Sequence, residues 1–246
     1  MRDSQAPLRR NLYGRRAGHA LRPAQRERFD RLMPSLGIGI QRPKGDLDLA
    51  SLFGNACSGY ALEIGFGSGE HLVAMALAQP QWGLIGAEYY INGIASALYR
   101  LEQAGFDDAS NVRLYQGDAR DVMDILPPSS LVAAYILFPD PWPKKRQWQR
   151  RIISHETLNH LARLIVPGGR LHIASDHPDY QPWIMRHVRE TPYFSWQPTS
   201  ADDWRCRPDD WPATRYEQKA LRNNQSCLYW RITRNNHSLP PSYISG

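Results

Sequence analysis

The chain has 246 residues, of which 42% are hydrophobic and 22% charged, so its length and composition fit one globular domain with a full core. The longest apolar run, residues 131–138, is too short to cross a bilayer, and Met1 leads into a charged segment, so we expect neither a membrane span nor a signal peptide. The net charge of +6 favours an anionic partner. Three cysteines at long spacings, with no CxxC pair, favour reduced thiols in a cytoplasmic protein and argue against structural zinc.

Residues 1–45 are polar, interrupted by prolines and rich in arginine. Nine arginines fall within residues 1–31, against Asp3, Glu27 and Asp30. Arginine matches phosphate through its planar fork of donors. This pattern predicts an N-terminal arm at residues 1–45 that is partly disordered when free, with one short helix at residues 23–32, followed by a folded domain at residues 46–246.

From residue 46 the pattern alternates between strand and helix. The expected strands are residues 60–64, 82–87, 112–116, 131–138, 170–174 and 227–233, and the expected helices are residues 71–78, 92–104, 150–165 and 182–189. Alternation of this kind predicts an α/β fold, a mostly parallel sheet with helices on both faces. Ligands of such sheets bind outside the carboxyl ends of the strands, where four acids are expected to share one rim: Glu88, Asp118, Asp140 and Asp176.

A glycine-rich turn follows the first expected strand. Gly65, Gly67 and Gly69 are preceded by Glu63 and followed by Glu70. A carboxylate at position 70 would repel the pyrophosphate of a dinucleotide. The E-x-G-x-G-x-G pattern instead resembles the first motif of class I S-adenosylmethionine-dependent methyltransferases, which implies a Rossmann-like, seven-stranded sheet and that cofactor. Glu88 then suits the ribose hydroxyls and Asp118 the adenine amino group, although acids at strand ends are also common helix caps.

Residues 136–151 form an apolar run that ends in Asp140 and continues into a basic and aromatic segment. Five basic residues stand within eight positions of this segment, and two tryptophans are interleaved with them: Lys144, Lys145, Arg146, Arg150 and Arg151, with Trp142 and Trp148. Cations attract phosphate and aromatic rings stack on bases, so this segment indicates chemistry on a nucleic acid.

Residues 140–146, 175–180, 214–219 and 62–70 together resemble the bacterial tRNA (guanine-N7)-methyltransferases, over nearly the whole chain. That resemblance implies methyl transfer to N7 of guanine-46, in the variable loop of tRNA. It implies cofactor contacts from Glu63, Gly65, Gly67, Gly69, Glu88, Asp118 and Asp140, with Asp140 as the catalytic residue. It implies substrate contacts from Lys144, Asp176, Thr214, Arg215, Tyr216 and Glu217, and RNA contacts from Arg146, Gln147, Trp148, Gln149, Arg150 and Arg151. We expect no metal and no obligate protein partner.

Several of these residues also have structural interpretations. Thr214 and Glu217 have capping-box spacing, Asp176 is placed to cap a helix, and residues 144–151 could be a solvated helix start. Gln147 and His19 depart from the basic residues common in the family. Two other functions stay open: a methyltransferase for another RNA or another base atom, and an inactive tRNA-binding protein.

Overall fold

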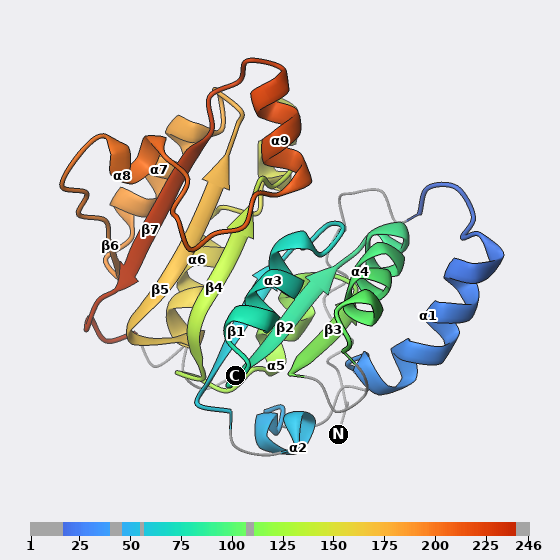
Figure 1. Ribbon diagram of the computed structural model, residues 1–246. Helices are drawn as coiled ribbons and strands as arrows, with labels where there is room; N and C mark the ends of the chain where they lie inside the picture. Colours follow the sequence, from blue (N-terminus) through green and yellow to red (C-terminus); the bar gives the residue numbers. More distant parts are fainter. Residues whose placement is uncertain (1–16, 40–45, 55–56, 107–110, 240–246) are drawn as a thin grey trace, which may run out of the picture.

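A mixed seven-stranded sheet forms the centre of the computed structural model, which describes residues 17–39, 46–54, 57–106 and 111–239 (Figure 1). The strand order is β3-β2-β1-β4-β5-β7-β6. The strands are β1 Gly59–Ile64, β2 Trp82–Glu88, β3 Val112–Gln116, β4 Leu131–Leu137, β5 Ile165–Ser175, β6 Phe194–Ser195 and β7 Leu228–Arg234.

The sheet is parallel except at one edge. β1 pairs with β2 and β4, β2 with β3, and β4 with β5, all in parallel, whereas β7 runs antiparallel to β5 and β6. The strand order reverses direction between β1 and β4, which is where sheets of this kind open a crevice for a ligand. The predicted Rossmann-like α/β architecture with a mostly parallel sheet is confirmed, and β7 is the strand whose pairings are antiparallel.

Helices cover both faces of the sheet. One face packs against α2 Leu49–Phe53, α5 Ala119–Ile125, α6 His155–Leu164 and α7 Gln181–Glu190, and the other against α1 Pro23–Leu36, α3 Glu70–Ala78, α4 Ile91–Gln103 and α9 Arg215–Arg222. The remaining helical segments are the 3-10 helix η1 Lys145–Arg150 and the short α8 Asp202–Arg205. Because both faces are covered, β4 reads as a continuous apolar run in which all residues but Val132 are buried.

Two expected elements begin five residues away from their predicted starts. The helix predicted at residues 150–165 begins at His155, because the Ser154 hydroxyl caps it by accepting the Thr157 N–H at 3.2 Å, and η1 precedes it. The strand predicted to begin at Arg170 begins at Ile165, since residues 167–169 are absorbed as a register shift between β4 and β5 rather than as a loop. The short α2, α5, α8 and β6 were not predicted.

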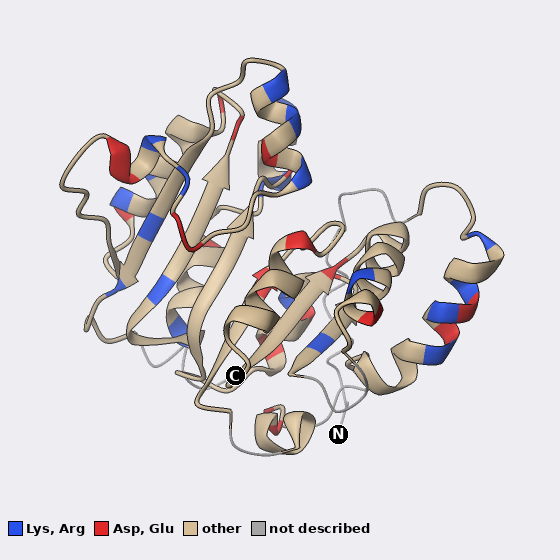
Figure 2. Ribbon diagram, viewed as in Figure 1, with Lys and Arg blue, Asp and Glu red and all other residues tan. Residues whose placement is uncertain are grey.

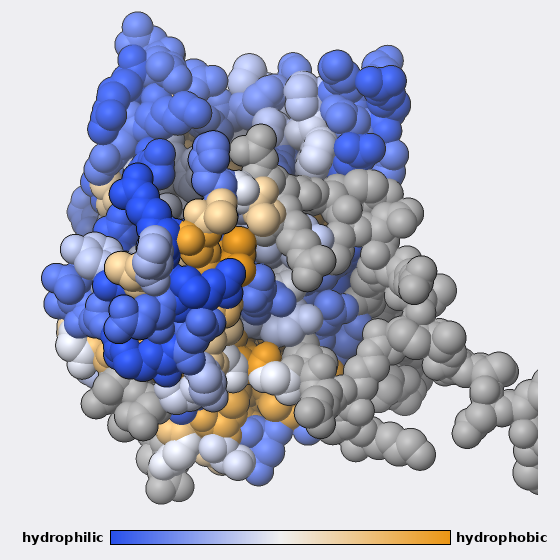
Figure 3. All heavy atoms as spheres, turned by 90° about the vertical axis from the view of Figure 1, so that its right-hand side faces the viewer, coloured by the Kyte–Doolittle hydropathy of each residue, from blue (hydrophilic) through white to orange (hydrophobic). Residues whose placement is uncertain are grey.

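The helix expected at residues 23–32 is α1, which continues to Leu36 and packs on α4 and β3. Leu36 is fully buried, and the Ile38 N–H donates to the Leu114 carbonyl at 2.8 Å. Figure 3 shows mostly hydrophilic residues on the side of the molecule that carries α1. Residues 1–16 and 40–45 lie outside the described residues, so the predicted domain boundary at residue 45 stays a prediction. None of the described helices is long and apolar enough to cross a membrane.

Candidate active site

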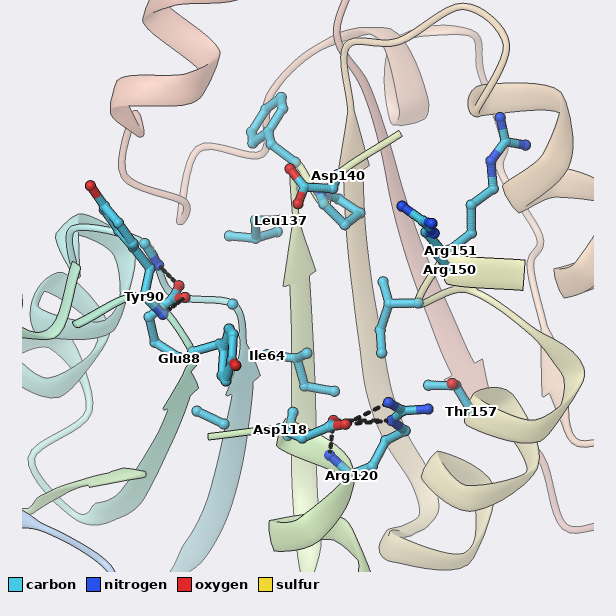
Figure 4. A pocket seen from close by; sticks show the side chains of 18 of the residues that line it. Ile64, Glu88, Tyr90, Asp118, Arg120, Leu137, Asp140, Arg150, Arg151 and Thr157 are labelled. Atoms are coloured by element: carbon cyan, nitrogen blue, oxygen red, sulfur yellow. Dashed lines mark hydrogen bonds and ion pairs between the residues drawn. The ribbon is translucent and has the colours of Figure 1, made fainter. Parts of the chain in front are cut away.

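A cavity of about 940 Å³ opens at the carboxyl ends of β1, β2, β3 and β4 (Figure 4). The glycine turn after β1 contributes Gly65 and Gly67 to its wall. Glu88, Asp118 and Asp140 line it from the ends of β2, β3 and β4. The structure therefore brings three of the four predicted rim carboxylates into one cavity, beside the point where the strand order reverses.

The glycine turn depends on left-handed backbone conformations. Gly67 has φ of 57° and Gly69, which is the N-cap residue of α3, has φ of 81°. A Cβ atom at Gly69 would lie 2.6 Å from the Cβ of Ala97 on α4. Gly69 thus permits both the sharp turn into α3 and the close packing of that turn on α4. Gly69 does not line the cavity, and its predicted cofactor contact stays a prediction.

Glu88 ties the glycine turn to the next strand. One carboxylate oxygen accepts the Gly67 N–H at 2.8 Å and the other accepts the Tyr90 N–H at 2.8 Å (Figure 4). Burial raises the pKa of the Glu88 carboxyl above its usual range, and the charge of Asp140 raises it further. Each carboxylate oxygen keeps a second lone pair with which it can accept a hydrogen bond from a ligand.

Asp118 combines a structural role with a place in the cavity wall. It caps α5 by accepting the Arg120 N–H at 3.0 Å, and it forms an ion pair with the Arg120 guanidinium, whose Nε lies 2.9 Å from Oδ2 (Figure 4). The capping interpretation of this acid is therefore correct, and the residue still faces the cavity. Arg120, which also lines the cavity, was not predicted; its position two residues after a rim acid was the available signal.

Asp140 stands beyond β4 on a short turn. Its side chain is exposed at the cavity mouth, and partial desolvation raises the pKa of its carboxyl. The turn is flanked by Phe138 and Trp142, whose φ values of 52° and 43° are left-handed. No described cation forms an ion pair with this carboxylate, so its charge remains available to a ligand.

Glu63 points to the opposite face of the sheet. Side chains alternate along β1, so Leu62 and Ile64 face one layer of helices and Glu63 the other. Its carboxylate lies 2.9 Å from Nδ1 of His71 in α3, and both side chains are buried. Glu63 does not line the cavity. The pairing with His71 supports the structural interpretation of Glu63, and its predicted cofactor contact stays a prediction.

The N-terminus of α9 divides its four predicted residues between two roles. The Thr214 hydroxyl accepts the Glu217 N–H at 3.2 Å, and the buried Glu217 carboxylate pairs with Arg207 at 3.0 Å and accepts the Tyr229 hydroxyl. These two residues cap and anchor the helix. Arg215 and Tyr216 reach the cavity, where the Tyr216 ring lies over the turn at Gly67.

Only part of the predicted RNA-contacting segment lies at the protein surface. Gln149, Arg150 and Arg151 line the cavity wall, and Lys144 and Arg146 are exposed outside it. Arg151, by contrast, is 4% exposed and packs among aromatic rings. Asp176, at the end of β5, does not line the cavity. Gln147 and Trp148 are half-buried within η1.

Across the described ranges, no group of three or more His, Cys, Asp and Glu residues could hold a metal ion.

Comparison with known proteins identifies the chain. The family model described as "Putative methyltransferase" matches residues 58–229. The tRNA (guanine-N(7)-)-methyltransferase of Ruegeria sp. (strain TM1040) is 43% identical and covers 94% of this chain and 90% of its own. That of Rhodopseudomonas palustris (strain BisB5) is 42% identical and covers 91% of this chain and 86% of its own.

The chain belongs to the tRNA (guanine-N(7)-)-methyltransferase family. It is a methyltransferase, as the glycine turn and the rim acids predicted. Solved structures share its fold at much lower identity. The 16S rRNA methyltransferase KamB covers 79% of this chain and 97% of its own with a TM-score of 0.51 at 16% identity, and PH0851 covers 75% and 44% with a TM-score of 0.55 at 13%.

Proposed function

We propose that this enzyme transfers a methyl group from S-adenosylmethionine to N7 of guanine-46 in the variable loop of tRNA. The observation that carries the proposal is the single cavity in which the glycine turn, Glu88, Asp118 and Asp140 meet, in a chain that is 41–43% identical to methyltransferases of that name.

The residues of the cavity fit this cofactor. S-adenosylmethionine carries a positive sulfonium and no phosphate. Burial, and then the charge of Asp140, raise the pKa of the Glu88 carboxyl, and a cationic ligand between the two acids would favour their ionised forms. Glu88 would accept the ribose hydroxyls with the lone pairs that the Gly67 and Tyr90 amides leave free. Asp118, oriented by Arg120, would accept the adenine amino group. When bound, the cofactor supplies an electrophilic methyl group.

Asp140 is the proposed catalytic residue. Guanine N7 carries a lone pair and no proton, so the attack on a methyl group needs no general base. The Asp140 carboxylate, exposed at the cavity mouth, would accept hydrogen bonds from the N1–H and N2–H edge of guanine. It would also balance the positive charge that develops on the base as the methyl group arrives. Its second contribution is to fix the orientation of the base.

Basic residues around the cavity support a tRNA substrate. Arg150 and Arg215 line its wall, and Lys144 and Arg146 are exposed nearby, where they would contact phosphates. The target guanine would leave its stack to enter the cavity, as in base flipping, and Tyr216 at the cavity wall offers a ring on which it could stack. We retain Asp176, Thr214 and Glu217 as proposed supports of the substrate site. Because tRNA resides in the cytoplasm of bacteria, we place the enzyme there.

Labelled S-adenosylmethionine incubated with the pure protein and unmodified bulk tRNA tests the reaction. We expect label in tRNA, and none in 16S rRNA or in tRNA that already carries the methyl group. Label in rRNA alone would move the substrate to another RNA. Absence of label with tRNA binding intact would contradict the proposal and favour an inactive tRNA-binding protein.

A further inference from the structure

The turn that carries Asp140 is held in a backbone conformation that its residues do not favour. Phe138 and Trp142, two residues before and two after Asp140, have φ values of 52° and 43°. Bulky residues with positive φ are rare, and such conformations persist only where surrounding contacts impose them. At the first end, the Phe138 N–H donates to the Ala174 carbonyl at 2.8 Å. At the second end, Trp142 lies beyond β4, so contacts from outside the sheet must hold it.

Arg151 makes the contacts at that other end. Its Nε donates to the carbonyl of Pro141 at 2.8 Å, and its Nη2 lies 3.5 Å from the carbonyl of Trp142. These are the two residues that follow Asp140. The Arg151 side chain is only 4% exposed, and none of the ion pairs found in the described part of the chain involves it. Its guanidinium therefore donates to the backbone of the turn and forms no ion pair with the Asp140 carboxylate.

Aromatic rings fix the position of the Arg151 guanidinium. Its Cζ lies 4.8 Å from the ring centres of Tyr180 and Trp183 and 5.1 Å from that of Trp148. Two of these rings are themselves tied to the backbone at Ile153: the Ile153 N–H donates to the Tyr180 hydroxyl at 3.1 Å, and the Trp183 indole donates to the Ile153 carbonyl at 2.7 Å. Cation–π contacts replace the missing counter-charge, so the guanidinium is both buried and rigid.

We infer that Arg151 is a positioning residue that holds the Asp140 turn in its working conformation, and that it does not contact RNA. The inference rests on the proposed function, because it assigns Arg151 a part in that reaction. The chain of contacts runs from the rings of α7 and η1 through Arg151 to the Pro141 carbonyl and so to Asp140. Placement errors of about 1 Å at a reacting group cost about 100-fold in rate, so a held turn matters for turnover rather than for binding.

The test compares Arg151→Lys with Arg186→Lys in steady-state methylation of tRNA. Arg186 is a matched control, since its guanidinium stacks on Trp183 at 4.9 Å but is exposed and bonds no part of the turn. Lysine at 151 keeps the charge among the rings but lacks the planar fork that reaches the carbonyls. We expect kcat to fall about 100-fold, KM for tRNA and for the cofactor to change less than about threefold, and the salt dependence of tRNA binding to stay the same. Arg186→Lys should retain the wild-type kcat.

Two results would overturn the inference. One is a kcat for Arg151→Lys within about threefold of wild type with KM for tRNA also unchanged, which would leave the residue no part in turnover. The other is a kcat within the same range with a raised KM for tRNA and a shallower salt dependence, which marks a phosphate contact. If Arg151→Lys does not fold, Trp183→Phe decides, because it keeps an aromatic ring beside the guanidinium and removes the indole bond to Ile153. Its kcat should fall with KM unchanged, and a wild-type kcat would contradict the role. Absent turnover in wild-type protein assayed alongside would overturn the proposed function itself, together with the inference.

Discussion

At the scale of single residues, the cavity is defined by carboxylates that differ in how they are used. Glu88 and Asp118 are bound to backbone amides or to arginine, and so hold the walls as well as facing the ligand. Asp140 has no such partner in the described structure, and partial desolvation at the cavity mouth raises the pKa of its carboxyl. An acid that is positioned but not neutralised is suited to stabilise a positive charge that appears only during the reaction.

Replacing Asp140 by asparagine removes the charge of the side chain and keeps its shape. We expect Asp140→Asn to lower kcat by about 100-fold or more, as loss of a preorganised electrostatic contact does elsewhere. Cofactor affinity should change less than about threefold, because Glu88 and Asp118 remain. Single-turnover methylation and calorimetric titration of S-adenosylmethionine measure the two quantities. Near wild-type turnover in Asp140→Asn would remove the residue from catalysis.

The raised pKa also predicts a pH dependence. Asp140 must be ionised to accept hydrogen bonds and balance charge, so activity falls as pH falls through its pKa. Because desolvation raises that pKa, the loss should begin at a higher pH than for an ordinary aspartate. A profile of kcat from pH 4.5 to pH 8 measures it. The residual activity of Asp140→Asn should lack this acid limb; an identical limb in both proteins would assign it to another group.

At the scale of elements, the turn from β1 into α3 is the most demanding connection in the site. It needs left-handed backbone at Gly69 and leaves no room for a side chain against Ala97. Glu63 and His71 clamp the same connection from the buried side, at 2.9 Å. The cavity wall therefore depends on packing that lies outside the cavity.

Gly69→Ala tests this packing against a matched control. We expect it to lower the free energy of unfolding by about 2–5 kcal/mol, from the left-handed backbone and the contact with Ala97 together. Gly54 has a similar φ of 70° but open space around its Cβ position, so Gly54→Ala should cost only about 1–2 kcal/mol. Urea denaturation measures both. Equal losses in the two variants would show that the contact with Ala97 contributes nothing.

The sequence allowed the strands and their rim to be predicted well, because strand periodicity and glycine turns are local signals. Glu88, Asp118 and Asp140 end three strands in the order expected and meet in one cavity. Local sequence patterns do not reveal the features that depend on tertiary contacts. The strand β5 continues through residues 167–169 because β4 offers it a partner, and Glu63 turns to His71 because the alternation of β1 places it on the α3 face. The burial of Arg151 depends on rings from α7, 29 and 32 positions along the chain, which no local pattern reveals.

At the scale of the whole molecule, the basic residues differ in whether acidic side chains already pair with them. Figure 2 shows basic residues on α1 interleaved with acids. Arg28 pairs with Glu102 at 2.6 Å, Arg31 with the same carboxylate, and Arg26 lies 3.8 Å from Asp30. The arginines of α1 thus serve partly to hold the helix on α4. Five further arginines of the predicted arm lie within residues 1–16.

Deletion of residues 1–16 tests whether that charge binds RNA. Gly18 and His19 should stay in place, since the Gly18 N–H donates to the Asn92 side chain at 2.9 Å and Asn92 donates to the His19 carbonyl at 2.9 Å. We expect the slope of log affinity for tRNA against log salt to become shallower by about 1 to 4, as phosphate contacts are lost. The melting temperature should not change. An unchanged slope would exclude the arm from RNA binding.

The central claim, methylation of one ring nitrogen of one tRNA base, has a direct chemical test. A 7-methylguanine base is labile: borohydride reduction followed by aniline cleaves the RNA chain where it stands. Unmodified tRNA treated with the enzyme and S-adenosylmethionine should be cut at the variable-loop guanine, and tRNA treated for the same short time with Asp140→Asn should be cut far less. Incorporated methyl groups without cleavage at that guanine would contradict the account, because they would place the methyl group on another atom or another base.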